Sequence, residues 1–261
     1  MTFKEYTPAK ALQPYIEAYW IRWSRSQTTA RRVYADGCAD LMRNAGEATV
    51  FFAPKADTGE SIPLRPGVLY VGGTMSAYGV VRGGPCRVTG VRFRPGGLFA
   101  LYRTPMKAAV DRLVEFRDPA LEAELAAEEG LADRLDAYFG ARPRFGHRDF
   151  GAIYQQILDS RGQLSVEDLA SACHVSRRTL ERVFLEYTGI PAKQYIRIVR
   201  FRQVLERLRE AGNPESLLRI AYDFGYTDHA HLTNEFKQYA GILPSELSHF
   251  YKTGISRGQY F

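Results

Sequence analysis

One segment of this 261-residue chain occurs twice within its last hundred residues. Phe184 follows Ala170 by 14 residues, and Phe236 follows Ala221 by 15. In both copies a tyrosine follows the phenylalanine by three residues and a glycine by five. The matching positions are Leu169, Ala170, Ser176, Leu180, Phe184, Tyr187, Gly189 and Pro191 in the first copy, and Ile220, Ala221, Thr227, Leu232, Phe236, Tyr239, Gly241 and Pro244 in the second. Such a repeat predicts two copies of one structural unit.

Each copy has the pattern of two short helices joined by a tight turn. In the first copy, Ser165 with Asp168 forms a capping box at the first helix, and Ser176 caps the second helix. The second helix buries an apolar face around Phe184 and turns a polar face outward. The outward positions are Arg177, Arg178, Glu181 and Arg182, and in the second copy His229, Ala230, Thr233, Asn234 and Lys237. This is the helix-turn-helix pattern used in the major groove of DNA.

A long helix is predicted between the two copies, from Pro191 to Arg209, with a stop at Gly212-Asn213-Pro214. Its length is about 28 Å at ~1.5 Å per residue, close to the ~34 Å between successive major grooves on one DNA face. Tilted helices or bent DNA would cover the difference. The alternative is a helical bundle without a nucleic-acid role, which the duplication and the basic outward face disfavour.

Residues 150–250 resemble the DNA-binding domain of the AraC/XylS family of bacterial transcription regulators. The resemblance rests on the repeat, on Tyr195 and Arg200 between the copies, and on Gly225-Tyr226 and Asp228-His229 in the second copy. It implies a domain in which two helix-turn-helix units on a linker helix read two major-groove segments. Carried over by position, base reading falls on Arg178, Glu181, Arg182, His229, Ala230, Thr233 and Asn234.

Two positions depart from the family pattern. His174 stands in the first turn where the family usually has glycine or asparagine, and it is predicted to adopt a positive φ with mild strain. Ala230 offers a base only a methyl contact, for instance to thymine. We therefore expect the first unit to dominate specificity, with Arg178 or Arg182 bidentate to guanine. The alternative for either arginine is a phosphate contact.

The first hundred residues contain short apolar runs separated by Gly, Pro and Asp turns, which predicts an antiparallel sandwich or barrel. Residues 10–23 begin helically or irregularly, and residues 98–141, including Leu113, follow helical spacing. The expected class is α+β. A β-rich effector or dimerisation domain (1–141) and a linker (142–149) precede an all-α double helix-turn-helix domain (150–252).

Residues 6–126 resemble the cupin-like β-barrel sensor domain of a subgroup of the same family. The matching features are Pro14-Tyr15-Ile16, Trp20, Asp36-Gly37, the stretch from Gly90 to Gly97, and Pro105. The resemblance implies a small-molecule effector. Its pocket is predicted to have aromatic walls and an anion clamp, with the candidates Tyr19, Trp20, Trp23 and Tyr34 for the walls and Arg31, Arg92 and Arg94 for the clamp. The alternative places these aromatic residues in the core and the arginines in solvent.

All five histidines lie after residue 146, so a histidine-based metal centre in the first domain is disfavoured. We expect no metal, no cofactor and no catalytic site, and therefore no enzyme. Cys38 and Cys86 raise the hypothesis of a thiol sensor, because Arg87 beside Cys86 favours a thiolate. The alternative is that both thiols are unreactive.

Residues 119–141 carry apolar positions suited to antiparallel helix packing, with Leu121, Leu125, Leu131, Leu135, Tyr138 and Phe139 as candidates. They predict a homodimer, or else packing onto the chain's own barrel. The N-terminus lacks the apolar core of a signal peptide, and no stretch is long enough to cross a bilayer, so cytoplasmic localisation is expected.

The net charge of +6 agrees with a polyanionic partner but does not locate it. We therefore predict an AraC-type regulator that binds double-stranded DNA, modulated by a small-molecule effector. The alternatives are a metabolite-binding enzyme and a constitutive DNA-binding dimer without effector. The effector, the operator and the sign of regulation are not specified by the sequence.

Overall fold

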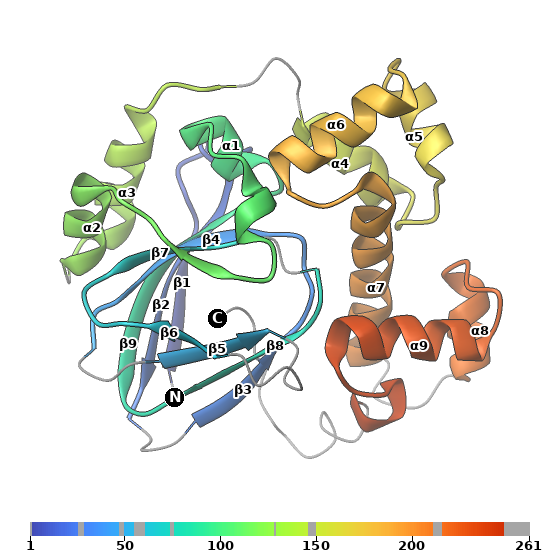
Figure 1. Ribbon diagram of the computed structural model, residues 1–261, viewed down its shortest axis with the longest axis horizontal. Coiled ribbons are helices and arrows are strands. Elements are labelled where there is room, and N and C mark those ends of the chain that lie inside the picture. The colour runs from blue at the N-terminus through green and yellow to red at the C-terminus, as the bar shows by residue number, and fades with distance from the viewer. Residues whose placement is uncertain are drawn as a thin grey trace.

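The computed structural model describes residues 2–25, 29–46, 50–54, 61–73, 76–127, 129–145, 150–210 and 216–247. Two antiparallel sheets form the N-terminal part, and a group of helices forms the C-terminal part (Figure 1). This confirms the predicted α+β class. Within these ranges, no helix is both long and apolar enough to span a membrane.

The larger sheet has the strand order β1-β2-β9-β4-β7-β10, and the smaller sheet has the order β3-β8-β5-β6. The strands of the larger sheet are β1 (Thr2–Tyr6), β2 (Ile16–Ser24), β9 (Cys86–Phe93), β4 (Ala39–Asn44), β7 (Leu69–Gly72) and β10 (Leu113–Glu115). Those of the smaller sheet are β3 (Thr29–Val33), β8 (Gly79–Gly83), β5 (Val50–Pro54) and β6 (Ile62–Leu64). The apolar runs bounded by turns are therefore strands, as predicted. Residues 10–15 form turns that lead into β2.

The larger sheet is the middle layer of three. Successive side chains of a strand point to opposite faces, and β2 shows this clearly. Trp20 packs in the core between the two sheets, together with Met42 and Phe52. Tyr19 and Ile21 pack on the other face.

Two helices, α2 (Pro119–Ala126) and α3 (Leu131–Gly140), cover that other face of the larger sheet (Figure 1). Their apolar residues are at most 2% exposed and pack on the sheet: Leu121, Leu125, Leu131, Leu135 and Phe139. Tyr138 is half-buried against the same cluster. The prediction that this face pairs with a second chain is therefore wrong for the five buried positions. The alternative, packing onto the chain's own sheet, is confirmed.

Along the chain, β9 is followed by α1 (Gly97–Tyr102), a 3-10 helix η1 (Met106–Ala109) and the sheet strand β10, and then by α2. The helical spacing that included Leu113 was misleading, because Leu113 begins β10 and pairs with Gly72 at the edge of β7. Pairing with the free edge of β7 satisfies backbone groups of both strands, and this outweighs a weak local helical pattern.

The C-terminal part contains α4 (Phe150–Asp159), α5 (Val166–Ala172), α6 (Arg177–Tyr187), α7 (Ala192–Glu210), α8 (Leu217–Asp223) and α9 (His229–Ala240). Residues 146–149 of the predicted linker and residues 248–252 of the predicted DNA-binding domain lie outside the described residues. The described part of the linker is fixed to the sheet-rich part. The guanidinium of Arg142 stacks 3.8 Å from the centre of the Tyr102 ring, and the Phe145 N–H donates to the Ala100 carbonyl.

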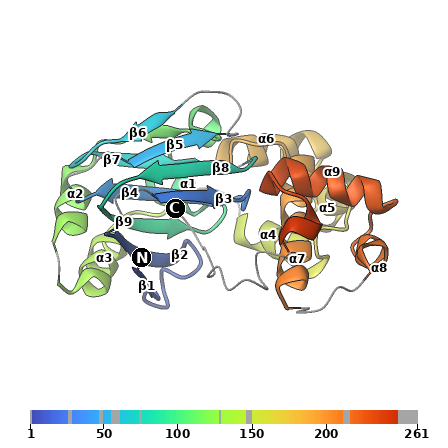
Figure 2. The ribbon, with the colours of Figure 1, turned by 90° about the horizontal axis from the view of Figure 1, so that it is seen from below.

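The two parts of the chain share an extensive interface (Figure 2). Ala35 and Phe99 belong to the hydrophobic core of the helical part. Phe99 lies with its ring centre 4.3 Å from that of Tyr187, at the end of α6. The Ala35 N–H donates to the Tyr239 carbonyl of α9 over 3.1 Å. The sheet-rich part therefore contacts both repeated units.

Candidate nucleic-acid interface

The first repeated unit consists of α5, a tight turn and α6. Ser165 and Asp168 form the predicted capping box at α5. The Ser176 hydroxyl accepts a hydrogen bond from the Thr179 N–H and caps α6, as predicted. His174 in the turn has φ 52°, which confirms the predicted positive φ at this position.

The second unit repeats this geometry with α8 and α9. Gly225 makes the turn with φ 70°. Asp228 caps α9 by accepting a hydrogen bond from the His231 N–H. Both second helices therefore begin at a side-chain cap, which satisfies a backbone N–H group that has no partner within the helix.

The helix α7 joins the two units and has the 19 residues expected of the connecting helix, which is called the rod below. The buried carboxylate of Glu235 ties α9 to this rod. It accepts hydrogen bonds from Arg197 Nε over 2.6 Å and from Arg200 Nη2 over 2.9 Å. The Tyr226 hydroxyl donates to the same carboxylate over 2.7 Å. A carboxylate with three charged or polar donors is well compensated for its burial.

Sequence reasoning did not identify Glu235 as important. A signal was present, because Glu235 lies three residues after Leu232 and therefore on the inward face of α9. A charged residue at an inward position needs buried partners, and Arg200, which belongs to the family pattern, is one of them.

The outward face of α6 is exposed and basic. Arg177, Arg178 and Arg182 are all exposed. Arg177 pairs with Glu167 over 2.7 Å, and Arg182 lies 3.8 Å from Glu186. Both are exposed ion pairs, which are weak, so these guanidiniums remain accessible to a polyanion.

Glu181 is placed differently from the three arginines. Its carboxylate accepts a hydrogen bond from the Ala192 N–H over 3.1 Å, at the first residue of α7. This contact stabilises the start of α7, because the first N–H groups of a helix have no partner inside it. Glu181 therefore connects the first unit to the rod.

In the second unit, His229, Ala230, Asn234 and Lys237 are exposed on α9. Thr233 is half-buried, and within the described part of the chain its Oγ1 is buried without a hydrogen-bond partner. The structure thus exposes four of the five predicted residues of this helix and turns the polar atom of the fifth inward.

Removal of the α6 cap by Ser176→Ala is expected to lower the free energy of unfolding by about 1 kcal/mol, since the Thr179 N–H loses its partner. Urea denaturation of the full chain measures this. Ser171→Ala is the matched control, because Ser171 is exposed within α5, where alanine is a better helix former. Equal stabilities of the two variants would contradict the capping role.

The predicted effector residues do not converge on one site. Tyr19 faces α3, where its hydroxyl donates to Asp136 over 2.8 Å, whereas Trp20 faces the smaller sheet. Trp23 packs on the same face as Tyr19, and Tyr34 packs against the core of the helical part. Because β2 alternates, its three aromatic residues do not line one pocket together.

The arginines predicted to form the anion clamp also do not lie at one site. Arg92 is buried and pairs with Asp36 and with Asp40, the latter over 3.0 Å. Arg94 is exposed, and its Nε donates to the Gln13 carbonyl over 2.7 Å. The side chain of Arg31 lies outside the described residues.

Both candidate sensor thiols are buried. Burial raises the pKa of Cys38, although Arg92 opposes this shift. Burial likewise raises the pKa of Cys86, with Arg22 in opposition. The positive charge that acts on Cys86 is thus Arg22 of β2 and not the predicted neighbour Arg87, and desolvation outweighs its effect and favours the thiol.

Comparison with known proteins agrees with this geometry. A helix-turn-helix domain family matches residues 169–249, and a domain of unknown function, DUF6597, matches residues 4–115. Multiple antibiotic resistance protein MarA of Escherichia coli is 30% identical over 94 residues, which cover 36% of this chain and 72% of MarA. The transcriptional regulator ArgR of Pseudomonas aeruginosa is 29% identical over 86 residues, 32% of this chain and 25% of ArgR.

Among solved structures, ToxT from Vibrio cholerae has a similar fold. One ToxT structure aligns with a TM-score of 0.51 at 11% identity and covers 95% of this chain and 98% of ToxT. Another, bound to (E)-4-(8-methylnaphthalen-1-yl)but-3-enoic acid, aligns with a TM-score of 0.50 at 11% identity and covers 96% and 100%. At this level of identity the likeness concerns the fold.

Two capped helix-turn-helix units on one rigid helix, preceded by a sheet-rich part, define a DNA-binding transcription regulator. The match to MarA and to the helix-turn-helix family model identifies the family of this regulator. The chain belongs to the AraC/XylS family.

Proposed function

We propose that α6 and α9 enter successive major grooves on one face of DNA. Arg178 and Arg182 read bases in the first groove, and α9 reads the second. The proposed contact residues are Arg177, Arg178, Arg182, His229, Ala230, Asn234 and Lys237. Glu181 and Thr233 position the helices, since their polar atoms are engaged or buried.

The observation that supports this most is the exposed pair Arg178 and Arg182 on a capped helix whose opposite face is fully buried. Arginine presents a forked donor that matches the O6 and N7 acceptors of guanine. The rod α7 has a length of about 28 Å, which is suited to adjacent major grooves.

Selection of bound DNA from a random pool tests this proposal. We expect the full chain to enrich a bipartite site, and Arg182→Ala to lose discrimination at one base position by about 1–3 kcal/mol. Arg117→Ala removes the same charge from a position near α2, away from both reading helices, and serves as control. If both variants lose affinity uniformly over all sequences, Arg182 is a phosphate contact and the base-reading proposal fails for it.

For the N-terminal part we propose a small-molecule effector that modulates DNA binding. Residues 1–141 form the effector domain, 142–149 the linker and 150–252 the DNA-binding domain. ToxT, which has a similar fold, is known bound to a small carboxylic acid, and this supports a ligand-responsive N-terminal part. A homodimer and a cytoplasmic location complete the proposal. Five of the six residues first expected to form the dimer face are buried within the chain and do not contribute to it.

A further inference from the structure

A cavity of about 180 Å³ lies between the sheet-rich part and the DNA-binding helices. The sheet-rich part provides its floor with Glu17, Asp36, Cys38 and Arg92. The helices α4 and α7 provide the opposite wall with Tyr154, Leu158, Val199, Arg202, Gln203 and Glu206. Any molecule that fills this cavity contacts both parts of the regulator.

The floor carries more negative than positive charge. Two carboxylates of the floor, those of Glu17 and Asp36, lie beside one guanidinium, that of Arg92, which is only 2% exposed and also pairs with Asp40 outside the lining. Asp36 and Asp40 pair with it directly, and Glu17 lies 3.7 Å from its Nε. Buried charges are stable when they are balanced. The floor is therefore complementary to a cationic group of a ligand.

The opposite wall carries a cation, Arg202, and a carboxylate, Glu206, which pairs with Arg209 over 2.7 Å. Arg202 lines the cavity from α7 and acts electrostatically on Tyr154, which lines the same wall from α4. Within the described ranges, no carboxylate lies at ion-pair distance from Arg202. A guanidinium without a carboxylate at ion-pair distance can form a charge-assisted hydrogen bond with a carboxylate of a ligand.

The volume limits the size of that ligand. An apolar cavity of about 150 Å³ holds a molecule the size of benzene, so this cavity suits a molecule only slightly larger. A drug-sized ligand requires roughly 300 Å³ or more. The space, the acidic floor and the arginine on the wall together fit a small molecule with one ammonium and one carboxylate group.

We infer that this interdomain cavity is the effector site and that it binds a small zwitterion of the α-amino acid class. The ammonium group faces Glu17 and Asp36, and the carboxylate pairs with Arg202. This inference rests on the proposed effector function and gives it a location and a ligand class. Because Arg202 belongs to the rod between the two DNA-reading units, the bound zwitterion connects the sheet-rich part to that rod.

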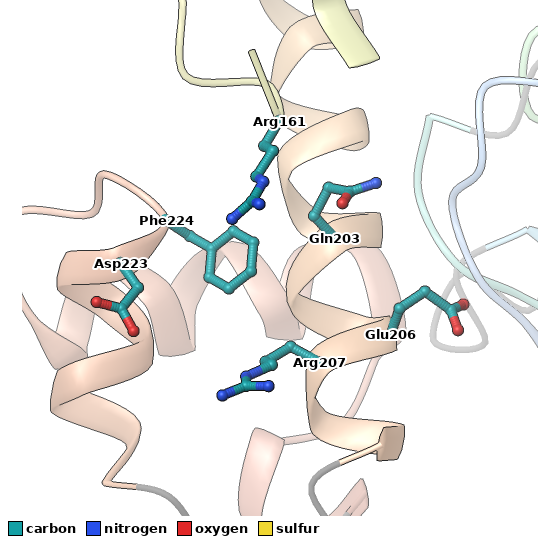
Figure 3. Close-up of a pocket in the computed structure, with 6 residues that line it drawn as sticks. All are labelled: Arg161, Gln203, Glu206, Arg207, Asp223 and Phe224. Carbon is teal, nitrogen blue, oxygen red and sulfur yellow. The ribbon is translucent and has the colours of Figure 1, made fainter. Parts of the chain in front are cut away.

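The opposite side of α7 offers a matched control. A second cavity, of about 580 Å³, lies there between α7 and α8 and shares Gln203 and Glu206 with the first. Figure 3 shows Arg207 pointing from α7 toward the side of Asp223 and Phe224, whereas the carboxylate of Glu206, whose residue lines both cavities, lies on the other side of α7. Arg207→Gln therefore makes the same substitution as Arg202→Gln, on the same helix, outside the proposed site.

Calorimetric titration of the full chain with the standard L-α-amino acids tests the inference. We expect at least one to bind saturably, and its decarboxylated amine and N-acetylated acid to bind more weakly. Arg202→Gln should weaken binding of the zwitterion at least about tenfold, with little effect on the amine. Glu17→Gln should weaken binding of both the zwitterion and the amine, and Arg207→Gln should weaken neither.

Absence of binding by any amino acid to the wild type would overturn the inference, as would equal effects of Arg202→Gln and Arg207→Gln. The analogue series in the wild type tests the ligand class even if a variant fails to fold. DNA selection with the same protein preparation distinguishes failure of the base-reading proposal from failure of the cavity assignment. Selective DNA binding without amino-acid binding leaves the base-reading proposal intact, and amino-acid binding without DNA selectivity leaves the cavity assignment intact.

Discussion

Replacement of Arg92 by leucine is expected to lower the free energy of unfolding by about 3–5 kcal/mol at neutral pH. The reason is the charge that remains, since Asp36 and Asp40 lose the guanidinium that both now contact. Among the described residues, the Trp20 indole N–H remains as a partner of Asp40 and donates to it over 3.0 Å. Urea denaturation of the full chain, followed by circular dichroism, measures the loss.

The same variant should show a distinct pH dependence. Burial raises the pKa of Asp40 from 3.8 to about 6, against the opposing effect of Arg92. Because the folded pKa lies above the unfolded one, the contribution of Asp40 is fully favourable below about pH 4 and is lost as the pH rises through 6. Without Arg92 the pKa of Asp40 rises further. The destabilisation relative to wild type should therefore be smaller at about pH 5 than at about pH 7.

Arg94→Leu is the matched control, because Arg94 lies two residues further along the chain and is exposed. It is expected to change stability by less than about 1 kcal/mol, with no added pH dependence. An Arg92→Leu variant whose destabilisation is the same at both pH values would show that its loss comes from packing rather than from uncompensated carboxylates.

The helix-turn-helix units were predictable because their determinants are local. Ser165 with Asp168, Ser176 and His174 in the first turn each act within a few residues, and each has the predicted role or conformation in the structure. The repeat then fixed the spacing of the two units through a helix of known rise. Local signals of this kind are readable from one sequence.

The cavity between the two parts was not predictable in the same way. Glu17 and Arg92 lie on neighbouring strands β2 and β9, whereas Arg202 lies on α7 far along the chain. No periodicity links such positions, and their meeting depends on how the two parts pack. The aromatic residues of β2 were grouped by type, but strand alternation places Tyr19 and Trp20 on opposite faces.

Glu235→Ala is expected to lower the free energy of unfolding by about 3–5 kcal/mol, because it leaves Arg197 and Arg200 without their shared carboxylate. The side chain of Glu235 is fully buried, that of Arg200 is 14% exposed and that of Arg197 is 35% exposed, so the guanidinium of Arg200 is the more costly one to leave unpaired. By comparison, Glu167→Gln breaks an exposed pair with Arg177 and should cost about 0–1 kcal/mol. Chemical denaturation of the full chain compares the two variants.

The consequence for DNA reading should be specific to one half of the site. Glu235 ties α9 to α7, while α6 is held to α7 by Glu181 and to the sheet-rich part by Tyr187. Under conditions where Glu235→Ala remains folded, DNA selection is therefore expected to lose the half-site read by α9 and to keep the half-site read by α6. Equal loss at both half-sites would mean that the rod itself depends on Glu235, and retention of both would mean that apolar packing of Phe236 against Phe201 alone positions the second unit.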